Sequence, residues 1–364
     1  MSFCDLAVSG VAELQPYVPG KPIEELQRQY GVRDVIKLAS NENPLGPSKA
    51  ALAAVAKSSK EMTRYPDGNG YTLKMALAEK LRLSPEQITL GNGSNDVLEL
   101  LARAFAGHGD EIIYSEHAFA VYPLAAKAIG ATGIATPAKD YGHDLSAMLK
   151  AISLRTKLIF IANPNNPTGT WVEPSEIQAF LDKVPEKVLV VLDEAYVEYL
   201  EQTETAISWL QDFDNLVITR TFSKAYGLAG LRIGYALSHP EIADLLNRIR
   251  QPFNANSLAQ AAAVAALGDE AYLRESREMN EAGMKQLITG FDKMGLKFIP
   301  SKGNFITVNV QTNAAEVYDE LLYEGVIVRP VAGYGLPQHL RVSIGLEQEN
   351  QRFLEALSRV LGRG

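Results

Sequence analysis

The chain has 364 residues, a formal net charge of −8 at pH 7, 46% hydrophobic residues and 21% charged residues. This length exceeds what one hydrophobic core usually serves, so we expect a globular protein of two domains. The acidic balance argues against a nucleic-acid binder, and no apolar run is long enough to cross a membrane. A single cysteine, Cys4, and a start without a recognisable secretory signal favour the cytoplasm.

The first 40 residues are expected to form an N-terminal arm. Three prolines and a glycine within residues 15–22 favour extended backbone, and a short helix is expected from about Ile23 to Tyr30. The next string, Lys37–Pro47, is dense in Asn, Pro and Gly and predicts a fixed irregular loop before a helix from Ser48 to Lys57. Turn chemistry alone leaves open whether this loop is a plain turn or part of a site.

A glycine-containing helix entrance follows the second turn cluster, Arg64–Tyr71, and its helix. An apolar strand at residues 88–91 leads through Gly93, Ser94 and Asn95 into an apolar helix ending near Phe105. Such an entrance frees backbone N–H groups to face an anion, which the helix dipole also favours. A plain helix cap by Ser94 or Asn95 is the alternative. The string is not a dinucleotide fingerprint, because the third glycine and the preceding βαβ context are missing.

Two buried strands in the middle of the chain end in polar residues. Lys157–Ala162 runs into Asn163–Thr170, and residues 188–192 run into Asp193 and Tyr196. Ligands of α/β proteins usually bind at the carboxyl ends of such strands. A carboxylate there is costly unless a partner neutralises it. A metal is the less favoured partner for Asp193, because no His or Cys cluster accompanies it, and we expect no metal site.

The most informative stretch is Thr219–Gly234, which follows an apolar strand. Lys224 stands just past the strand end, where lysine is a poor choice unless its charge is suppressed or used. Apolar or cationic neighbours lower the basicity of a lysine and make its amine a nucleophile. The hydroxyls of Thr221 and Ser223, with Arg232, are suited to a phosphate, so the residues indicate pyridoxal phosphate (PLP). The alternative is a solvated loop lysine beside a surface arginine.

The last hundred residues alternate short strands and helices and predict a compact α+β unit. We expect the arm to occupy residues 1–40, a large domain residues 41–255 and a small domain residues 256–364, with a long helix toward Leu287 joining the domains. Arg329 and Arg341 lie at strand ends of the small domain. For each of them, a solvated arginine on an edge strand is the default interpretation.

The extended string around Lys224 resembles the Schiff-base signature of the fold-type I, class II PLP-dependent aminotransferases, in particular the histidinol-phosphate aminotransferases. Four further segments are similar to that family and follow in the expected order: residues 16–22, Lys37–Pro47, Asn163–Thr170 and Leu340–Gly345. The resemblance implies an α/β fold. Its large domain has a mostly parallel sheet flanked by helices, with the cofactor at the strand tips, and its smaller α+β domain packs with the arm.

The same resemblance implies how the cofactor is held. Lys224 bonds covalently to PLP, Asp193 faces the ring nitrogen, and Asn166 and Tyr196 lie at the phenolate oxygen. An aromatic ring, here Phe119, stacks on the pyridine ring. The resemblance also assigns the groups that hold the cofactor phosphate: Ser94, Asn95, Thr221, Ser223, Arg232 and, from a neighbouring subunit, Tyr65. This last assignment implies a homodimer.

The implied reaction is amino-group transfer between L-histidinol phosphate and 2-oxoglutarate, in histidine biosynthesis. Tyr17, Asn43, Arg329 and Arg341 are the expected substrate-binding residues, with Arg341 taking a carboxylate through its planar fork. Four alternatives remain open: an aromatic amino-acid aminotransferase, a PLP-dependent decarboxylase of a phosphorylated amino acid, a PLP-binding regulator and an α/β binding protein without cofactor.

Overall fold

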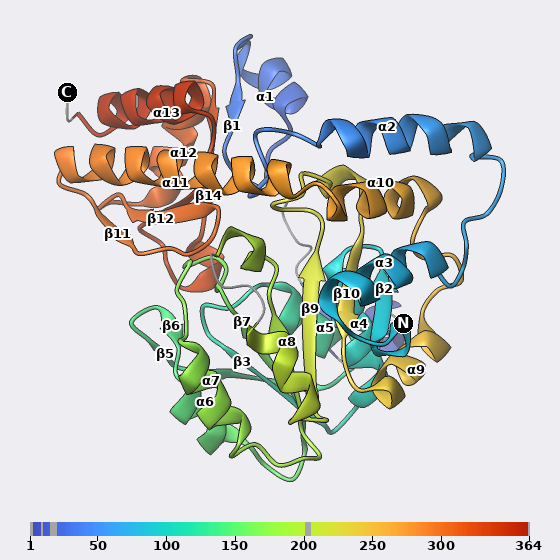
Figure 1. Cartoon of the computed structure of the whole chain (residues 1–364). Helices are drawn as coiled ribbons and strands as arrows, with labels where there is room; N and C mark the ends of the chain where they lie inside the picture. Colours follow the sequence, from blue (N-terminus) through green and yellow to red (C-terminus); the bar gives the residue numbers. More distant parts are fainter. Residues whose placement is uncertain (1–2, 9, 15–19, 201–204, 363–364) are drawn as a thin grey trace.

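The computed structural model describes residues 3–8, 10–14, 20–200 and 205–362 (Figure 1). Tyr17 and residues 201–204 therefore lie outside the described residues. Among the described residues, no helix combines the length and apolar character needed to cross a membrane.

A seven-stranded sheet forms the centre of the large domain (Figure 1). Most neighbouring strands are parallel, and only β10 runs antiparallel to its neighbours β2 and β9. This confirms the expected mostly parallel sheet. From edge to edge the strands are β2 (Ile88–Gly91), β10 (Gly234–Leu237), β9 (Leu216–Thr221), β8 (Leu189–Asp193), β7 (Thr156–Ala162), β3 (Glu111–Ser115) and β4 (Thr132–Thr136).

Helices cover both faces of this sheet because successive strand residues point to opposite sides. On β9, Ile218 joins one apolar cluster and its neighbour Val217 joins the other. The Val217 face packs with α4 (Ser94–Phe105), α5 (Val121–Ala128) and α9 (Pro240–Ile249). The Ile218 face packs with the remaining large-domain helices, α2 (Lys49–Ser58), α3 (Tyr71–Leu81), α6 (Leu145–Ala151), α7 (Pro174–Leu181), α8 (Thr205–Ser208) and α10 (Ser257–Leu267).

The small domain has its own core on an antiparallel sheet. Its strands, in sheet order, are β11 (Lys297–Ile299), β12 (Phe305–Asn309), β15 (His339–Ser343) and β14 (Arg329–Pro330). Its helices are α11 (Glu270–Lys293), α12 (Ala314–Tyr323) and α13 (Glu347–Val360). The arm joins this domain: β1 (Ile36–Lys37) pairs with β13 (Val326–Ile327), and Leu26 of α1 (Ile23–Tyr30) packs beside Leu322. A two-stranded ribbon, β5 (Ala138–Lys139) and β6 (Gly142–His143), extends from the large domain.

Helix α10 does not follow the domain division expected from the sequence. Its alanines at positions 259, 262, 263 and 266 are buried in the large-domain core, against α2 and α3. The buried Leu287 and Phe291 of α11 belong instead to the small-domain core. We therefore propose that the boundary lies within α11 rather than between residues 255 and 256.

Gly283 in the middle of α11 provides a test of this packing. Helix propensity alone favours alanine over glycine by about 1 kcal/mol. A Cβ at Gly283, however, would lie 2.4 Å from Ile344 Cγ2 and 2.9 Å from Asn350 Nδ2, and both side chains are fully buried. We expect Gly283→Ala to lower the free energy of unfolding by about 1–3 kcal/mol, measured by urea denaturation.

Gly290→Ala, on the same helix, is the matched control. Its Cβ would meet only the side chain of Leu354, whose far end can turn away. We expect this variant to be neutral or slightly stabilised. Equal stability changes in the two variants would contradict the account of α11 packing.

Candidate active site

A cavity of about 180 Å³ lies at the carboxyl ends of the central strands, with walls from both domains and the arm. The polar residues at the strand ends meet here because the parallel strands all end at this edge of the sheet. The structure brings together twelve of the residues expected from the sequence: Ser94, Asn95, Phe119, Asn166, Asp193, Tyr196, Thr221, Ser223, Lys224, Arg232, Arg329 and Arg341.

Lys224 lies just beyond β9, and its Nζ donates a hydrogen bond to the Ser40 carbonyl at 3.0 Å. The same amine lies 5.8 Å from the centre of the Tyr196 ring. Burial, together with the guanidinium groups of Arg341 and Arg232, lowers the pKa of Lys224 to about 7, against the opposing effect of the nearby carboxylates. A substantial fraction of the amine is therefore neutral, and nucleophilic, near neutral pH.

Asp193 ends β8 and is buried. Tyr122 donates a hydrogen bond to its Oδ2 at 2.8 Å, and Thr219 of the adjacent strand donates one to Oδ1 at 3.0 Å. Burial raises the pKa of Asp193, although these two hydroxyls partly offset the rise. The carboxylate is held in one orientation but lacks a close cation, so it suits a cationic ligand group.

A chain of hydrogen bonds links the loop after β7 to the small domain and the arm. Asn166 Nδ2 donates to the Tyr196 hydroxyl at 3.1 Å, and Asn41 Nδ2 donates to the same hydroxyl at 2.9 Å. Arg341 Nη1 donates to Asn166 Oδ1 at 2.6 Å, and its Nη2 donates to the Ala39 carbonyl at 2.7 Å. Burial raises the pKa of Tyr196 to about 12, which Arg341 and Asn41 partly oppose. The phenol is therefore a hydrogen-bond donor near neutral pH.

The entrance to α4 and the side chain of Arg232 form an anion cradle. Gly93 has a φ of 84°, and a Cβ there would lie 2.4 Å from Arg232 Nη2, so only glycine admits the guanidinium. A Cβ at Gly234 would lie 2.4 Å from the Ser94 amide nitrogen. Arg232 Nη1 also donates to Ser223 Oγ at 3.3 Å. Backbone N–H groups, hydroxyls and a guanidinium thus converge as phosphate binding requires.

Arg329 and Arg341 face each other as neighbours on β14 and β15. Both line the cavity, and Arg341 is buried. The small domain thus places two positively charged side chains in the cavity lining. The expectation that both arginines are merely solvated edge-strand residues is therefore wrong for Arg341.

Two expected residues lie elsewhere. Asn43 does not line the cavity: its buried Nδ2 donates to the Ala225 carbonyl, Tyr272 and Ser276 at 2.9–3.0 Å, which fixes the loop. Its neighbour Asn41 lines the cavity instead, at a φ of 54° that asparagine tolerates. Tyr65 is 82% exposed and stacks on Phe253, with ring centres 4.7 Å apart. Tyr17 lies outside the described residues.

The sequence interpretation missed three residues of the hydrogen-bond network: Asn41, Tyr122 and Thr219. Thr219 could have been found from the sequence, because it lies on β9, next to Asp193 on the adjacent parallel strand β8. The sequence does not mark Tyr122, since a tyrosine in an apolar helix is usually a core residue. Its ring stacks on Phe160 at 4.6 Å while its hydroxyl reaches the acid.

The residues fit PLP on three independent counts. The buried Asp193 carboxylate, which forms no ion pair with a described residue, suits a protonated ring nitrogen. The glycine-lined cradle suits a phosphate, and the buried Lys224 amine suits an aldehyde. Among the described residues, no group of three or more His, Cys, Asp or Glu side chains is arranged to hold a metal ion.

Comparison with known proteins agrees with this geometry. The sequence profile of the family described as aminotransferase class I and II matches residues 33–357. The chain is 59% identical to histidinol-phosphate aminotransferase 2 of Pseudomonas fluorescens (strain Pf0-1), over 100% of this chain and 99% of that protein. It is 57% identical to histidinol-phosphate aminotransferase 1 of Nitrosococcus oceani, over 99% and 98% of the two chains.

Solved structures show the same fold. The histidinol-phosphate aminotransferase of Sinorhizobium meliloti, solved in complex with pyridoxal-5'-phosphate, has a TM-score of 0.89 at 31% identity, over 96% of this chain and 97% of that chain. The enzyme of Clostridium acetobutylicum has a TM-score of 0.84 at 27% identity, over 91% and 100% of the two chains. The chain belongs to the class I and II aminotransferases and, within them, to the family of histidinol-phosphate aminotransferases.

Proposed function

We propose that this chain is a PLP-dependent aminotransferase that transfers an amino group between L-histidinol phosphate and 2-oxoglutarate, in the cytoplasm and for histidine biosynthesis. The observation that carries the proposal is the convergence, in one cavity, of a buried lysine, an orphaned acid and two separate anion-binding walls. The names of the full-length relatives support the choice of substrate.

The large-domain residues would hold the cofactor. PLP supplies an aldehyde that takes up the amino group and a ring that withdraws electrons from the substrate carbon. Asp193 would keep the ring nitrogen protonated, and Asn166 and Tyr196 would donate hydrogen bonds to the phenolate oxygen. Phe119 would cover one ring face. The phosphate would take its hydrogen bonds from Ser94, Asn95, Thr221, Ser223 and Arg232.

Lys224 would serve first as the covalent anchor and then as the proton carrier. Its lowered pKa supports both roles, because the neutral amine attacks the aldehyde and later accepts a proton from the substrate carbon. Ser40, which accepts a hydrogen bond from Nζ, would hold the free amine inside the cavity.

The small domain would bind the substrate anions. Arg341 and Arg329 would receive the phosphate monoester of one substrate and the carboxylates of the other, and Tyr17 would add a further donor. Arg341 Nη1 and Nη2 donate to uncharged oxygens, of Asn166 and Ala39, and a guanidinium binds a carboxylate or phosphate more strongly than such acceptors. Asn43 would act indirectly, by holding the loop that presents Asn41.

A homodimer would complete the site. Tyr65 stacks on the exposed Phe253, and further large apolar side chains on α2, α3 and the segment between them are exposed: Leu52, Met62, Tyr71 and Met75. Exposed apolar side chains favour burial against another molecule. In the dimer, Tyr65 would reach the cofactor phosphate in the neighbouring subunit.

Borohydride reduction of the holoenzyme tests the anchor. We expect peptide mass mapping to locate a pyridoxyl adduct on Lys224. Lys224→Ala should lower kcat by about 10²–10⁴-fold or more, because both the anchor and the proton carrier are lost. Lys187→Ala, an exposed lysine outside the cavity, is the control and should be unaffected. An adduct on any other lysine would refute the assignment.

Steady-state assays with 2-oxoglutarate test the substrate. We expect histidinol phosphate to exceed histidinol in kcat/KM by about 10-fold or more, since charge-assisted hydrogen bonds to the phosphate are lost with histidinol. Arg329→Gln should reduce this ratio while leaving the cofactor bound. Negligible turnover of histidinol phosphate, beside rapid turnover of phenylalanine or tyrosine, would contradict the substrate but not the chemistry.

A further inference from the structure

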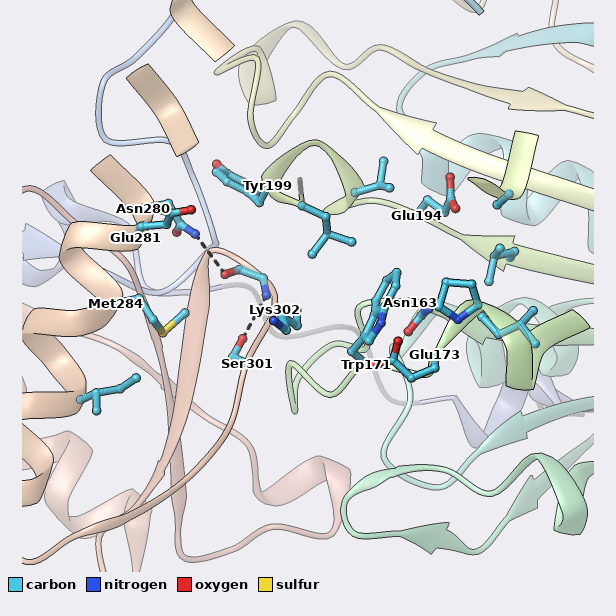
Figure 2. Close-up of a pocket in the computed structure, with 18 of the residues that line it drawn as sticks. Asn163, Trp171, Glu173, Glu194, Tyr199, Asn280, Glu281, Met284, Ser301 and Lys302 are labelled. Carbon is cyan, nitrogen blue, oxygen red and sulfur yellow. Dashed lines mark hydrogen bonds between the residues drawn. The ribbon is translucent and has the colours of Figure 1, made fainter. Parts of the chain in front are cut away.

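A second and larger cavity, of about 690 Å³, lies between the domains (Figure 2). Asn280, Glu281 and Met284 of α11 form one side of it, and Asn163, Trp171 and Glu173 of the large domain lie opposite (Figure 2). Its volume is in the range of small-molecule sites. None of the residues assigned above to the cofactor or the substrates lines it.

The two cavities share a wall. Asn163 and Glu194 line the interdomain cavity, whereas the next residue after Asn163, Pro164, and the residue before Glu194, Asp193, line the active-site cavity. Glu194 is not free to bind a ligand charge, because Arg220 pairs with it at 2.7 Å. An occupant of the interdomain cavity would therefore touch the back of the strand tips that carry Asp193 and Asn166.

The interior of this cavity is aromatic and aliphatic. Trp171 and Trp209, the only tryptophans in the chain, both line it. The aliphatic lining comes from both domains: Ile177, Leu192, Val197, Leu200, Met284 and Ile288. Such a lining favours an apolar or aromatic ligand group, since the half-buried Trp171 ring offers an apolar face, although Trp209 is almost fully buried.

The rim carries charges of both signs. Glu173 and Glu281 supply carboxylates, and Lys285 and Lys302 supply ammonium groups. None of the four forms an ion pair with a described residue. The cavity wall also keeps an unused acceptor, because Asn280 Oδ1 has no hydrogen-bond partner among the described residues, while its Nδ2 donates to the Gly303 carbonyl. A ligand with one charge of each sign complements this rim.

We propose that the interdomain cavity binds a free α-amino acid with an apolar or aromatic side chain. The side chain lies against Trp171 and the aliphatic lining, the ammonium group faces Glu281 and the carboxylate faces Lys302. The active site differs, because its arginines favour ligands that carry an additional negative charge. Since the ligand contacts α11 and the strand-tip wall together, it stabilises the domain arrangement described here.

Tryptophan fluorescence of the PLP-loaded enzyme reports occupancy directly, because both tryptophans line the cavity. The probe is N-methyl-L-phenylalanine, whose secondary amine keeps its N–H donors but is a poor replacement for Lys224. We expect a saturable change in emission with no change in the absorbance of the bound cofactor. N-methylphenethylamine, without the carboxylate, and hydrocinnamate, without the amine, should each bind about 3- to 10-fold more weakly.

The variant Lys302→Glu distinguishes binding in the interdomain cavity from non-specific binding, because Lys302 lines this cavity, is exposed and lies outside the active site. This variant should weaken the binding of N-methyl-L-phenylalanine and hydrocinnamate but not that of N-methylphenethylamine. Lys187→Glu, the same charge change at an exposed lysine outside the cavity lining, should leave the binding of all three unchanged. The proposal is overturned if no probe gives a saturable change, if N-methylphenethylamine binds as tightly as the zwitterion, if Lys302→Glu affects all three probes alike, or if binding shifts the cofactor absorbance.

Discussion

The active site depends on one buried carboxylate, that of Asp193, which forms no ion pair with a described residue. Asp193 is held by two hydroxyls, from Tyr122 and Thr219, yet burial still raises its pKa. Burying a carboxylate costs free energy, and a buried titratable group with a shifted pKa at a strand end is typical of a ligand-binding site. The proposed cofactor would offset this cost by placing a cationic ring nitrogen opposite the acid, and it would also account for the Lys224 amine and the backbone amides, hydroxyls and guanidinium that line the same small cavity.

The cavity as a whole holds more positive than negative charge. Burial and the guanidinium of Arg341 together lower the pKa of Lys224 to about 7, so the amine is reactive at neutral pH. Arginines of both domains line the cavity, Arg232 from the large domain and Arg329 and Arg341 from the small domain. Because Arg341 donates hydrogen bonds to Asn166 of the large domain and to Ala39 of the arm, it connects the walls that these segments form.

Much of the active site could be predicted from the sequence. The carboxyl ends of parallel strands lie at one edge of a sheet, so the residues that follow each strand come together whatever the course of the connecting loops. Local patterns and the family resemblance therefore predict Lys224, Asp193 and the expected anion ligands, and the structure brings them together in one cavity. Asn41 and Asn43 could not be told apart, since both occur in one irregular loop and only the backbone path decides which side chain faces the cavity.

Tyr122 was missed because its ring packs in the core. Helix α10 was assigned to the wrong side of the proposed domain boundary, since an alanine-rich helix carries no sign of which core it enters. Tyr65 lies on the surface of the single chain, so the role expected for it would require a second subunit.

The protonation state of the cofactor ring tests the central claim most directly. The enzyme is loaded with PLP labelled with ¹⁵N in the ring, and the ¹⁵N chemical shift is measured for the wild type and for Asp193→Asn. The account predicts a protonated ring nitrogen in the wild type at neutral pH and an unprotonated one in the variant. An unprotonated nitrogen in the wild type, or the same shift in both proteins, would contradict it.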